Sequence, residues 1–400
     1  MRKTLKTLLV AAVGLWAGAI VAQQPTQTAL IRLDTPQGAL LGTASERHPQ
    51  VSIFKGIPYA MPPVGQARWQ APKPAPTWQG ERLADTFGPD CLQQPYPEGS
   101  FFYRPARVSS EDCLYLNVWS AAEPGADRPV MVWIHGGALT RGSGAIDTYD
   151  GTNLAAKDVV VVTINYRLGV FGFFAHPELV SESPEFSAGN YGILDQIEAL
   201  RWVQQNIAAF GGDPDNVTIF GESAGAWSVN LLTASPLTEG LFHKVIAQSG
   251  ARLDTRVALD RQTSAGPPAI NSGVELATQL GAASVADLRN MPGRELLDRA
   301  MAAGFRTDGI VDGWVIPAQP YEIFSEGRQR AVPVMVGFNS DEGTTLGAAA
   351  NLPSTAEAYR ARLQAQFGDF ADLVLDVYPE DNIRESVLAS FRDATFGWNM

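Results

Sequence analysis

Hydrophobic residues in the middle of the chain follow two different patterns. Two runs, "PVMVWIH" at 129–135 and "DVVVVTINY" at 158–166, are apolar and rich in β-branched residues, without polar alternation. Strands buried on both faces have this pattern, so the runs predict a mostly parallel sheet flanked by helices. In the segment 192–212 that follows, apolar residues recur every three or four positions. This spacing predicts an amphipathic helix that Gly211 and Gly212 end.

The alternation of strand and helix continues towards the C-terminus. The run "VTIF" predicts a strand, "GESAG" a turn, and the residues from Ala224 to Ala234 a helix. The runs "KVIAQSG" and "VPVMVGFN" predict two more buried strands. Because buried strands and helices alternate in this way, the fold class is predicted to be α/β.

Other parts of the chain predict less regular structure. Short apolar stretches alternate with turns at 29–42 and 51–60, which predicts a small antiparallel sheet near the N-terminus. The proline-rich stretch 61–80 is predicted to be extended or irregular, because proline donates no hydrogen bond to a sheet. Residues 254–292 show a weak pattern that is typical of loops and short helices.

The first 22 residues have the pattern of a secretory signal peptide. The basic residues Arg2, Lys3 and Lys6 come first, and a short apolar core follows at 8–16. The small residues of a candidate cleavage site come next, at Ala17, Ala19 and Ala22. An uncleaved anchor or a buried helix is the alternative. We predict that residues 1–22 are removed, that 23–400 form a single domain, and that the protein is exported to the periplasm or the outside of the cell.

Charge and cysteine content narrow the classes of partner. The formal net charge is −12, which disfavours binding to nucleic acid or to an anionic membrane surface. Cys91 and Cys113 are the two cysteines, and in an exported chain such a pair favours a disulfide, with two free thiols as the alternative. Closing the loop between them would stabilise the fold by about 3 kcal/mol. Without a CxxC pair, a metal site is not expected.

The stretch "GESAG" places Ser223 between a predicted strand and a predicted helix. This is the arrangement of a nucleophile elbow, in which a strained turn exposes the serine hydroxyl at the end of a sheet. The pattern is weak when taken alone, and its context strengthens it. Gly136 and Gly137 directly follow another buried strand, where their N–H groups, with that of Ala224, would form an oxyanion hole. A plain glycine turn is the alternative.

A catalytic serine also needs an acid and a base. In this architecture the acid follows the serine in the sequence, and "NSDEG" places Asp341 and Glu342 after the last predicted strand. Either carboxylate would suit the orientation of an imidazole. The alternative is a solvated acidic turn.

Several longer motifs resemble those of the type-B carboxylesterases, the cholinesterase-like branch of the α/β-hydrolases. They are "FKGIPYAMPPVGQARW", "EDCLYLNV", "NYRLGVFGF", "GNYGILDQ", "FGGDPDNVTIFGESAG" and "GFNSDEG". The resemblance extends from about Leu30 to the end of the chain. It implies an α/β-hydrolase fold and ester hydrolysis through an acyl-enzyme, without a metal or an organic cofactor. Within the same fold, a catalytically inactive adhesion protein is the alternative function.

The resemblance also implies roles for individual residues. Ser223 would be the nucleophile and Glu342 the acid, while Gly136, Gly137 and Ala224 would hold the oxyanion. Glu222 would tune the electrostatics of the site, and Ser249 would support the acid.

The resemblance further implies three structural pairs. They are the disulfide between Cys91 and Cys113 and the ion pairs Arg68–Glu111 and Arg167–Asp195.

The base is not evident in this sequence. The four histidines are His48, His135, His176 and His243, and the 58 residues after Glu342 contain none. The family's catalytic histidine lies roughly a hundred residues beyond the acid. We therefore expect the C-terminal portion of the domain to be missing from this chain and the chain itself to be inactive or weak.

The C-terminal part and the substrate yield coarser predictions. Ser354 and Glu357 have the spacing of a capping box, which predicts a helix to about Phe367 that Gly368 ends. The segment between the cysteines has no tryptophan, which disfavours a quaternary-ammonium substrate. The default substrate is a small aryl or alkyl ester, and the sequence does not indicate an oligomeric state.

Overall fold

The computed structural model describes residues 30–250, 252–344, 346 and 352–397. The predicted signal peptide lies outside these residues. The strands of the structure are β1 (Ile31–Thr35), β2 (Gly38–Ala44), β3 (Ser52–Pro58), β4 (Glu81–Leu83), β5 (Asp90–Cys91), β6 (Ser109–Ser110), β7 (Tyr115–Ser120), β8 (Arg128–Ile134), β9 (Val160–Ile164), β10 (Gly212–Glu222), β11 (Lys244–Gln248) and β12 (Val334–Gly337). The helices are α1 (Thr152–Ala155), α2 (Gly169–Phe173), α3 (Pro177–Glu182), α4 (Tyr191–Asn206), α5 (Ala224–Ala234), α6 (Ala269–Gln279), α7 (Val285–Asn290), α8 (Gly293–Ala302), α9 (Pro320–Ser325), α10 (Ala356–Phe367), α11 (Ala371–Val377) and α12 (Ile383–Arg392).

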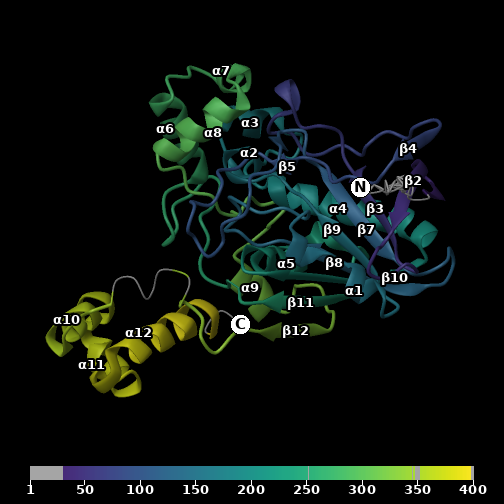
Figure 1. Ribbon diagram of the computed structural model, residues 1–400. Coiled ribbons are helices and arrows are strands. Elements are labelled where there is room, and N and C mark those ends of the chain that lie inside the picture. The colour runs from purple at the N-terminus through teal and green to yellow at the C-terminus, as the bar shows by residue number, and fades with distance from the viewer. Residues whose placement is uncertain (1–29, 251, 345, 347–351, 398–400) are drawn as a thin grey trace, which may run out of the picture.

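A single large sheet organises the molecule. Its order is β1-β2-β3-β7-β9-β8-β10-β11-β12, with β4 paired to β2. The neighbouring strands β9, β8, β10, β11 and β12 run parallel to one another. The sheet continues from β9 through β7, β3, β2 and β1 with antiparallel pairing. Helices flank this sheet in Figure 1. The structure therefore has the predicted α/β class, with the antiparallel strands joined to the parallel ones.

The predicted central elements are present with small changes at their ends. Helix α5 has the predicted bounds. Helix α4 ends at Asn206, and a turn of 3₁₀-helix continues it to Phe210 before Gly211 takes a left-handed φ of 78°. The strands β8, β9, β10 and β11 cover the predicted runs. Most of their inward side chains belong to one core cluster that also includes residues of α4 and α5.

Two predictions about the C-terminal part are wrong in detail. Strand β12 is exposed along its whole length rather than buried, because it pairs only with β11 and lies at the edge of the sheet. Helix α10 begins one residue later than the capping-box spacing predicts. Its N-cap is Thr355, whose side chain accepts a hydrogen bond from Ala358 N, and Glu357 therefore stands one position too early to complete a box.

The helices α10, α11 and α12 form a unit beyond β12. Figure 1 draws them in yellow-green, away from the sheet. They have a small hydrophobic cluster of their own around Tyr359 and Leu363. Arg392, at the end of α12, donates a hydrogen bond of 3.3 Å to the carbonyl of Ser340. No helix in the described part of the chain has the length and apolar character needed to cross a membrane.

Candidate active site

The turn at Ser223 joins the end of β10 to the start of α5. Ser223 has φ 55° and ψ −122°, a backbone conformation that is rare for a residue with a side chain. Its N–H donates a 2.9 Å hydrogen bond to the Gln248 carbonyl at the end of β11, and its carbonyl accepts from Trp227 N at 3.0 Å. Bonds to a neighbouring strand and to the following helix therefore hold the serine in its strained conformation.

Both glycines of "GESAG" lie where a side chain would not fit. A Cβ atom on Gly225 would be 2.0 Å from the carbonyl oxygen of Ile134, the last residue of β8. A Cβ atom on Gly221 would be 2.6 Å from the carbonyl carbon of Gly225. Real Cβ contacts do not come this close, so the two glycines allow strand, turn and helix to pack together.

The loop after β8 lies against the serine turn. A Cβ atom on Gly136 would be 3.2 Å from Cβ of Ser223 and 2.9 Å from Oε2 of Glu222. Gly137 has φ 108°, a conformation that favours glycine. Ala224 is fully buried as the first residue of α5, where a helix leaves its N–H groups without intrahelical partners. Gly136 and Ala224 therefore adjoin Ser223, and Gly137 is the next residue of the same loop.

Of the two acidic residues after β12, Glu342 contacts the sheet. Its Oε1 accepts hydrogen bonds from Ser249 Oγ at 2.6 Å, from Asn339 N at 3.0 Å and from Asn339 Nδ2 at 3.1 Å. Asp341 instead accepts from Ser340 Oγ within its own turn. Ser249 directly follows β11, so it places the Glu342 carboxylate near the end of the strand next to β10.

Glu222 carries an electrostatic perturbation beside the serine. Surrounding protein atoms and the negative charge of Glu342 raise the pKa of its carboxyl to about 7. Its surface is nevertheless exposed, so water screens the carboxylate and the shift corresponds to a small energy. Burial is the larger of these two causes, and the charge of Glu342 adds to it.

The rings of three histidines, His135, His176 and His243, have local contacts, and His48 has backbone hydrogen bonds within its own turn. Burial lowers the pKa of His135 to about 4, and its ring stacks on Tyr166 with centroids 4.4 Å apart. The Nδ1 atom of His176 accepts from Glu178 N at the start of α3, and that of His243 accepts from Val217 N. In the described residues, none of the four histidines has a hydrogen bond or ion pair with Ser223 or Glu342. The backbone of His135 lies against Gly225 of the serine turn, but no described imidazole is hydrogen-bonded to the serine or to the acid.

Comparison with known proteins identifies the family. A model of the carboxylesterase family matches residues 29–390. The chain is therefore a member of the carboxylesterase family. It is 41% identical over 386 residues to the fumonisin B1 esterase of Sphingopyxis macrogoltabida. The alignment covers 94% of this chain and 68% of that protein.

Other carboxylesterases show the same likeness. The para-nitrobenzyl esterase of Bacillus subtilis is 39% identical over 86% of this chain and 70% of its own length. The liver carboxylesterase of Sus scrofa is 41% identical over 82% of this chain, which spans only 60% of that enzyme. The crystal structure of the carboxylesterase EST55 of Geobacillus stearothermophilus aligns with a TM-score of 0.78 and 37% identity, covering 92% of this chain and 75% of that one. These likenesses and the sheet order give this carboxylesterase the α/β-hydrolase fold.

The two ion pairs implied by the resemblance are present in this carboxylesterase. Arg68 Nη2 lies 2.6 Å from Glu111 Oε1, and Arg167 Nη2 lies 2.7 Å from Asp195 Oδ1. The second pair is almost fully buried, with side-chain exposures of 3% and 0%. A buried pair of this kind is costly to break, because one charge would remain without its partner.

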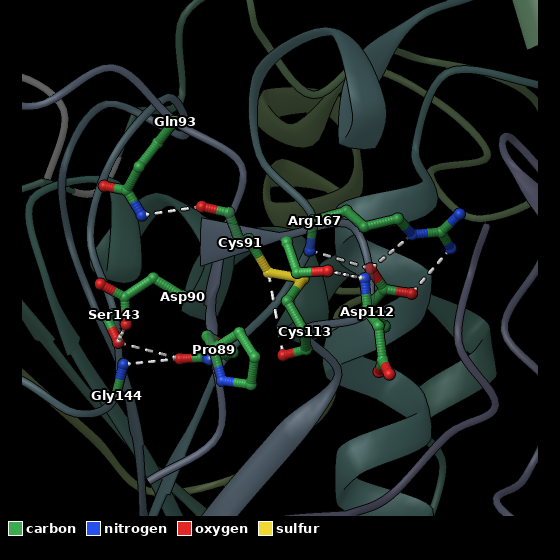
Figure 2. The surroundings of a disulfide bond; sticks show 12 residues. Pro89, Asp90, Cys91, Gln93, Asp112, Cys113, Ser143, Gly144 and Arg167 are labelled. Atoms are coloured by element: carbon green, nitrogen blue, oxygen red, sulfur yellow. Dashed lines mark hydrogen bonds and ion pairs between the residues drawn. A yellow bond between two sulfur atoms is a disulfide. The ribbon is translucent and has the colours of Figure 1, made fainter. Parts of the chain in front are cut away.

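The disulfide segment lies next to the glycine loop. Cys91 and Cys113 are bonded, and Figure 2 shows Gln93 and Asp90 beside them. The Gln93 side chain donates to the carbonyl of Gly142 and accepts from its N–H, both at 2.8 Å. Asp90 accepts a 2.7 Å hydrogen bond from Ser143 Oγ. The disulfide therefore anchors a segment that supports the loop carrying Gly136 and Gly137.

Sequence reasoning did not find this support. Gln93 and Asp90 lie outside the motifs, and nothing in their spacing connects them with Gly142 and Ser143. A polar side chain close to a predicted disulfide was the one available signal. In the described residues, no group of three or more His, Cys, Asp or Glu side chains is arranged to hold a metal ion.

Proposed function

We propose that this protein is a carboxylic ester hydrolase with Ser223 as its nucleophile. The observation that carries the proposal is the strained Ser223 turn, with φ 55°, packed against Gly136. Family membership supports it, as do relatives named for esterase activity on fumonisin B1 and on para-nitrobenzyl esters. The substrate would be a small-molecule ester.

The proposed reaction proceeds through an acyl-enzyme. Ser223 Oγ attacks the ester carbonyl carbon while its proton passes to a base, and the N–H groups of Gly136, Gly137 and Ala224 stabilise the oxyanion. The tetrahedral intermediate collapses, the C–O bond breaks, and the alcohol leaves with the proton. Water then attacks the acyl carbonyl and releases the carboxylic acid and free Ser223. Glu342, held by Ser249, would orient the protonated base.

We further propose that the 400-residue chain on its own hydrolyses esters weakly. None of its histidines is hydrogen-bonded to Ser223 or Glu342 in the described part, and serine without a base is a poor nucleophile. Loss of one member of a catalytic triad lowers turnover by as much as about 10⁶. Added imidazole would supply the missing group as a free molecule.

Hydrolysis of p-nitrophenyl butyrate with and without imidazole tests this function. We expect slow hydrolysis that imidazole accelerates beyond its effect in free solution. Ser223→Ala should abolish the imidazole-dependent rate, while Ser181→Ala, an exposed serine on α3, should retain it. Retention of the full imidazole-dependent rate by folded Ser223→Ala would overturn the assignment of the nucleophile.

A catalytically inactive binding protein is the competing function. Such a protein would not require the hydrogen bond between Ser249 and Glu342 at 2.6 Å. It is favoured if the folded chain shows no imidazole-dependent hydrolysis with any p-nitrophenyl ester.

We also propose that the protein is exported after cleavage of residues 1–22. The disulfide between Cys91 and Cys113 is compatible with an oxidising compartment. N-terminal sequencing of the protein from periplasm or culture medium tests this, and an N-terminus at Met1 would contradict it.

A further inference from the structure

A cavity of about 660 Å³ opens beside the serine turn. Its lining includes Ala138, which follows the two glycines of the loop, and Trp227, whose N–H bonds the carbonyl of Ser223. A Cβ atom on Gly250 would be 2.6 Å from the Ser223 carbonyl oxygen and 2.8 Å from Nε1 of Trp227. The cavity is therefore adjacent to the proposed point of chemistry.

One part of the cavity wall is apolar. Phe173 of α2, Leu276 of α6, and Phe305 and Ile310 of the segment after α8 all line it. Such walls suit the hydrocarbon part of an ester, as the default aryl or alkyl substrate requires.

Arg252, Asp254 and Asp308 belong to the rest of the wall, and the buried Arg256, which is not part of the lining, pairs with Asp308. Arg252 donates to Asp254 at 2.8 and 3.2 Å, and its Nη2 lies 3.5 Å from Asp308 Oδ2. Arg256, with 1% exposure, donates from Nη1 to Asp308 Oδ1 at 2.6 Å. The two aspartates are therefore already paired with two arginines.

Arg306 adds a positive charge that these ion pairs do not include. It lines the cavity, it is exposed, and it has no ion pair or side-chain hydrogen bond with any described residue. The Arg252 guanidinium lies 4.6 Å from the ring centroid of Trp227, which brings this part of the wall towards the serine turn.

The one other charged residue in the described lining is Glu275. It lies exposed on α6 and accepts a 3.2 Å hydrogen bond from Gln279. The cavity as a whole is thus not uniformly positive. The lining holds two basic side chains, Arg252 and Arg306, and three acidic ones, Asp254, Asp308 and Glu275, so its formal charge is −1. Of the two arginines, Arg306 alone has no ion pair with a described residue.

We propose that the part of the cavity around Arg306 binds a free carboxylate on the ester substrate. The inference rests on the proposed hydrolysis at Ser223 and narrows its substrate class to esters that carry a second, ionised acid group, such as monoesters of dicarboxylic acids. Guanidinium groups match carboxylates in geometry and charge, and Arg306 is available for this contact. The apolar wall would contact the chain that links the ester to the acid.

Calorimetric titration with two matched esters tests the proposal. Monomethyl glutarate carries the carboxylate, and dimethyl glutarate has it masked as a neutral ester. We expect the monoester to bind roughly tenfold more tightly than the diester, as one charge-assisted contact allows. Added salt should weaken the binding of the monoester and leave the binding of the diester unchanged. Repeating the titration on Ser223→Ala removes heat from turnover.

Variants of exposed arginines locate the binding site. Arg306→Gln should weaken the binding of monomethyl glutarate by roughly tenfold and leave the affinity for dimethyl glutarate unchanged. Arg328→Gln removes the same charge from an exposed arginine outside the cavity and should change neither. Equal affinity for the two esters, or unchanged monoester affinity in Arg306→Gln, would overturn the proposal. Weakening by Arg328→Gln to the same extent would also overturn it, because the effect would then come from net charge alone.

These titrations do not depend on catalysis. If p-nitrophenyl butyrate is not hydrolysed but the monoester still binds through Arg306, the proposed function fails and the carboxylate site stands. If hydrolysis occurs and the two glutarate esters bind equally, only the substrate class is wrong.

Discussion

Strands β10 and β12 have similar sequences and very different surroundings. Residues 217–220 of β10 read "VTIF", and β12 reads "VMVG". Val217 and Ile219 of β10 are fully buried, whereas Val334, Met335 and Val336 are 59%, 65% and 46% exposed. Strand β10 lies between β8 and β11 under α5, and β12 pairs with β11 alone. Burial is therefore decided by neighbours, and an apolar run does not report it.

The two strands also deliver their candidate site residues differently. Ser223 after β10 is fixed by backbone hydrogen bonds and by the close approach of Gly225 to Ile134. Glu342 after β12 is held by hydrogen bonds from the Ser249 side chain and from Asn339. We therefore expect the serine turn to tolerate almost no change and the region of β12 to tolerate much more.

The largest effect is expected at Gly225. Gly225→Ala would place a methyl group 2.0 Å from a carbonyl oxygen of β8, so strand or helix must move. We expect a loss of about 4 kcal/mol in the free energy of unfolding, or no folded protein. Urea denaturation measures it.

The matched control for this change lies on β12. A Cβ atom on Gly337 meets no atom within 4 Å, so Gly337→Ala should change stability by less than about 0.5 kcal/mol. Equal losses for Gly225→Ala and Gly337→Ala would remove the contrast between the two strands.

A smaller effect is expected from polar substitutions in the strands. Val217→Thr buries a hydroxyl group in β10 and should cost roughly 1–3 kcal/mol. Met335→Lys on exposed β12 should change stability by less than about 0.5 kcal/mol, and should reduce self-association because a charge blocks pairing at an exposed edge. Denaturation and sedimentation measure the two effects, and unfolding of Met335→Lys would contradict this description of β12.

The smallest effect is expected from Glu222. Its folded pKa of about 7 lies above the ordinary value of 4.5, so its contribution to stability is present below pH 4.5 and is lost as pH rises through 7. Glu222→Gln cannot ionise and should therefore raise the melting temperature at pH 8 relative to the parent, by roughly 1 °C, and not at pH 4. An equal change at both pH values would show that Glu222 does not titrate in this way.

Local pattern predicted the centre of the fold well. Helix α5 and the strands around it are recognisable because apolar periodicity, the glycine turn and the strand order agree with one another. The burial of β12 was not predictable, since it depends on which segments lie beside that strand. The N-cap of α10 was missed by one residue because Ser354 and Thr355 are both good caps and backbone geometry chooses between them.

The candidate site divides in the same way. Ser223 and the two loop glycines follow from short motifs next to strands. The two arginines of the cavity do not, because Arg252 and Arg306 come from irregular segments that only the folded chain brings to one cavity. The support that Gln93 gives to the glycine loop was hidden for the same reason.

The most direct test of the central claim is covalent labelling of the serine. The protein is incubated with a fluorophosphonate in the presence of imidazole and then digested for peptide mapping by mass spectrometry. Our account predicts an adduct on Ser223 that is absent in Ser223→Ala and present in Ser181→Ala. An adduct on another residue, or no adduct on the folded chain, would contradict it.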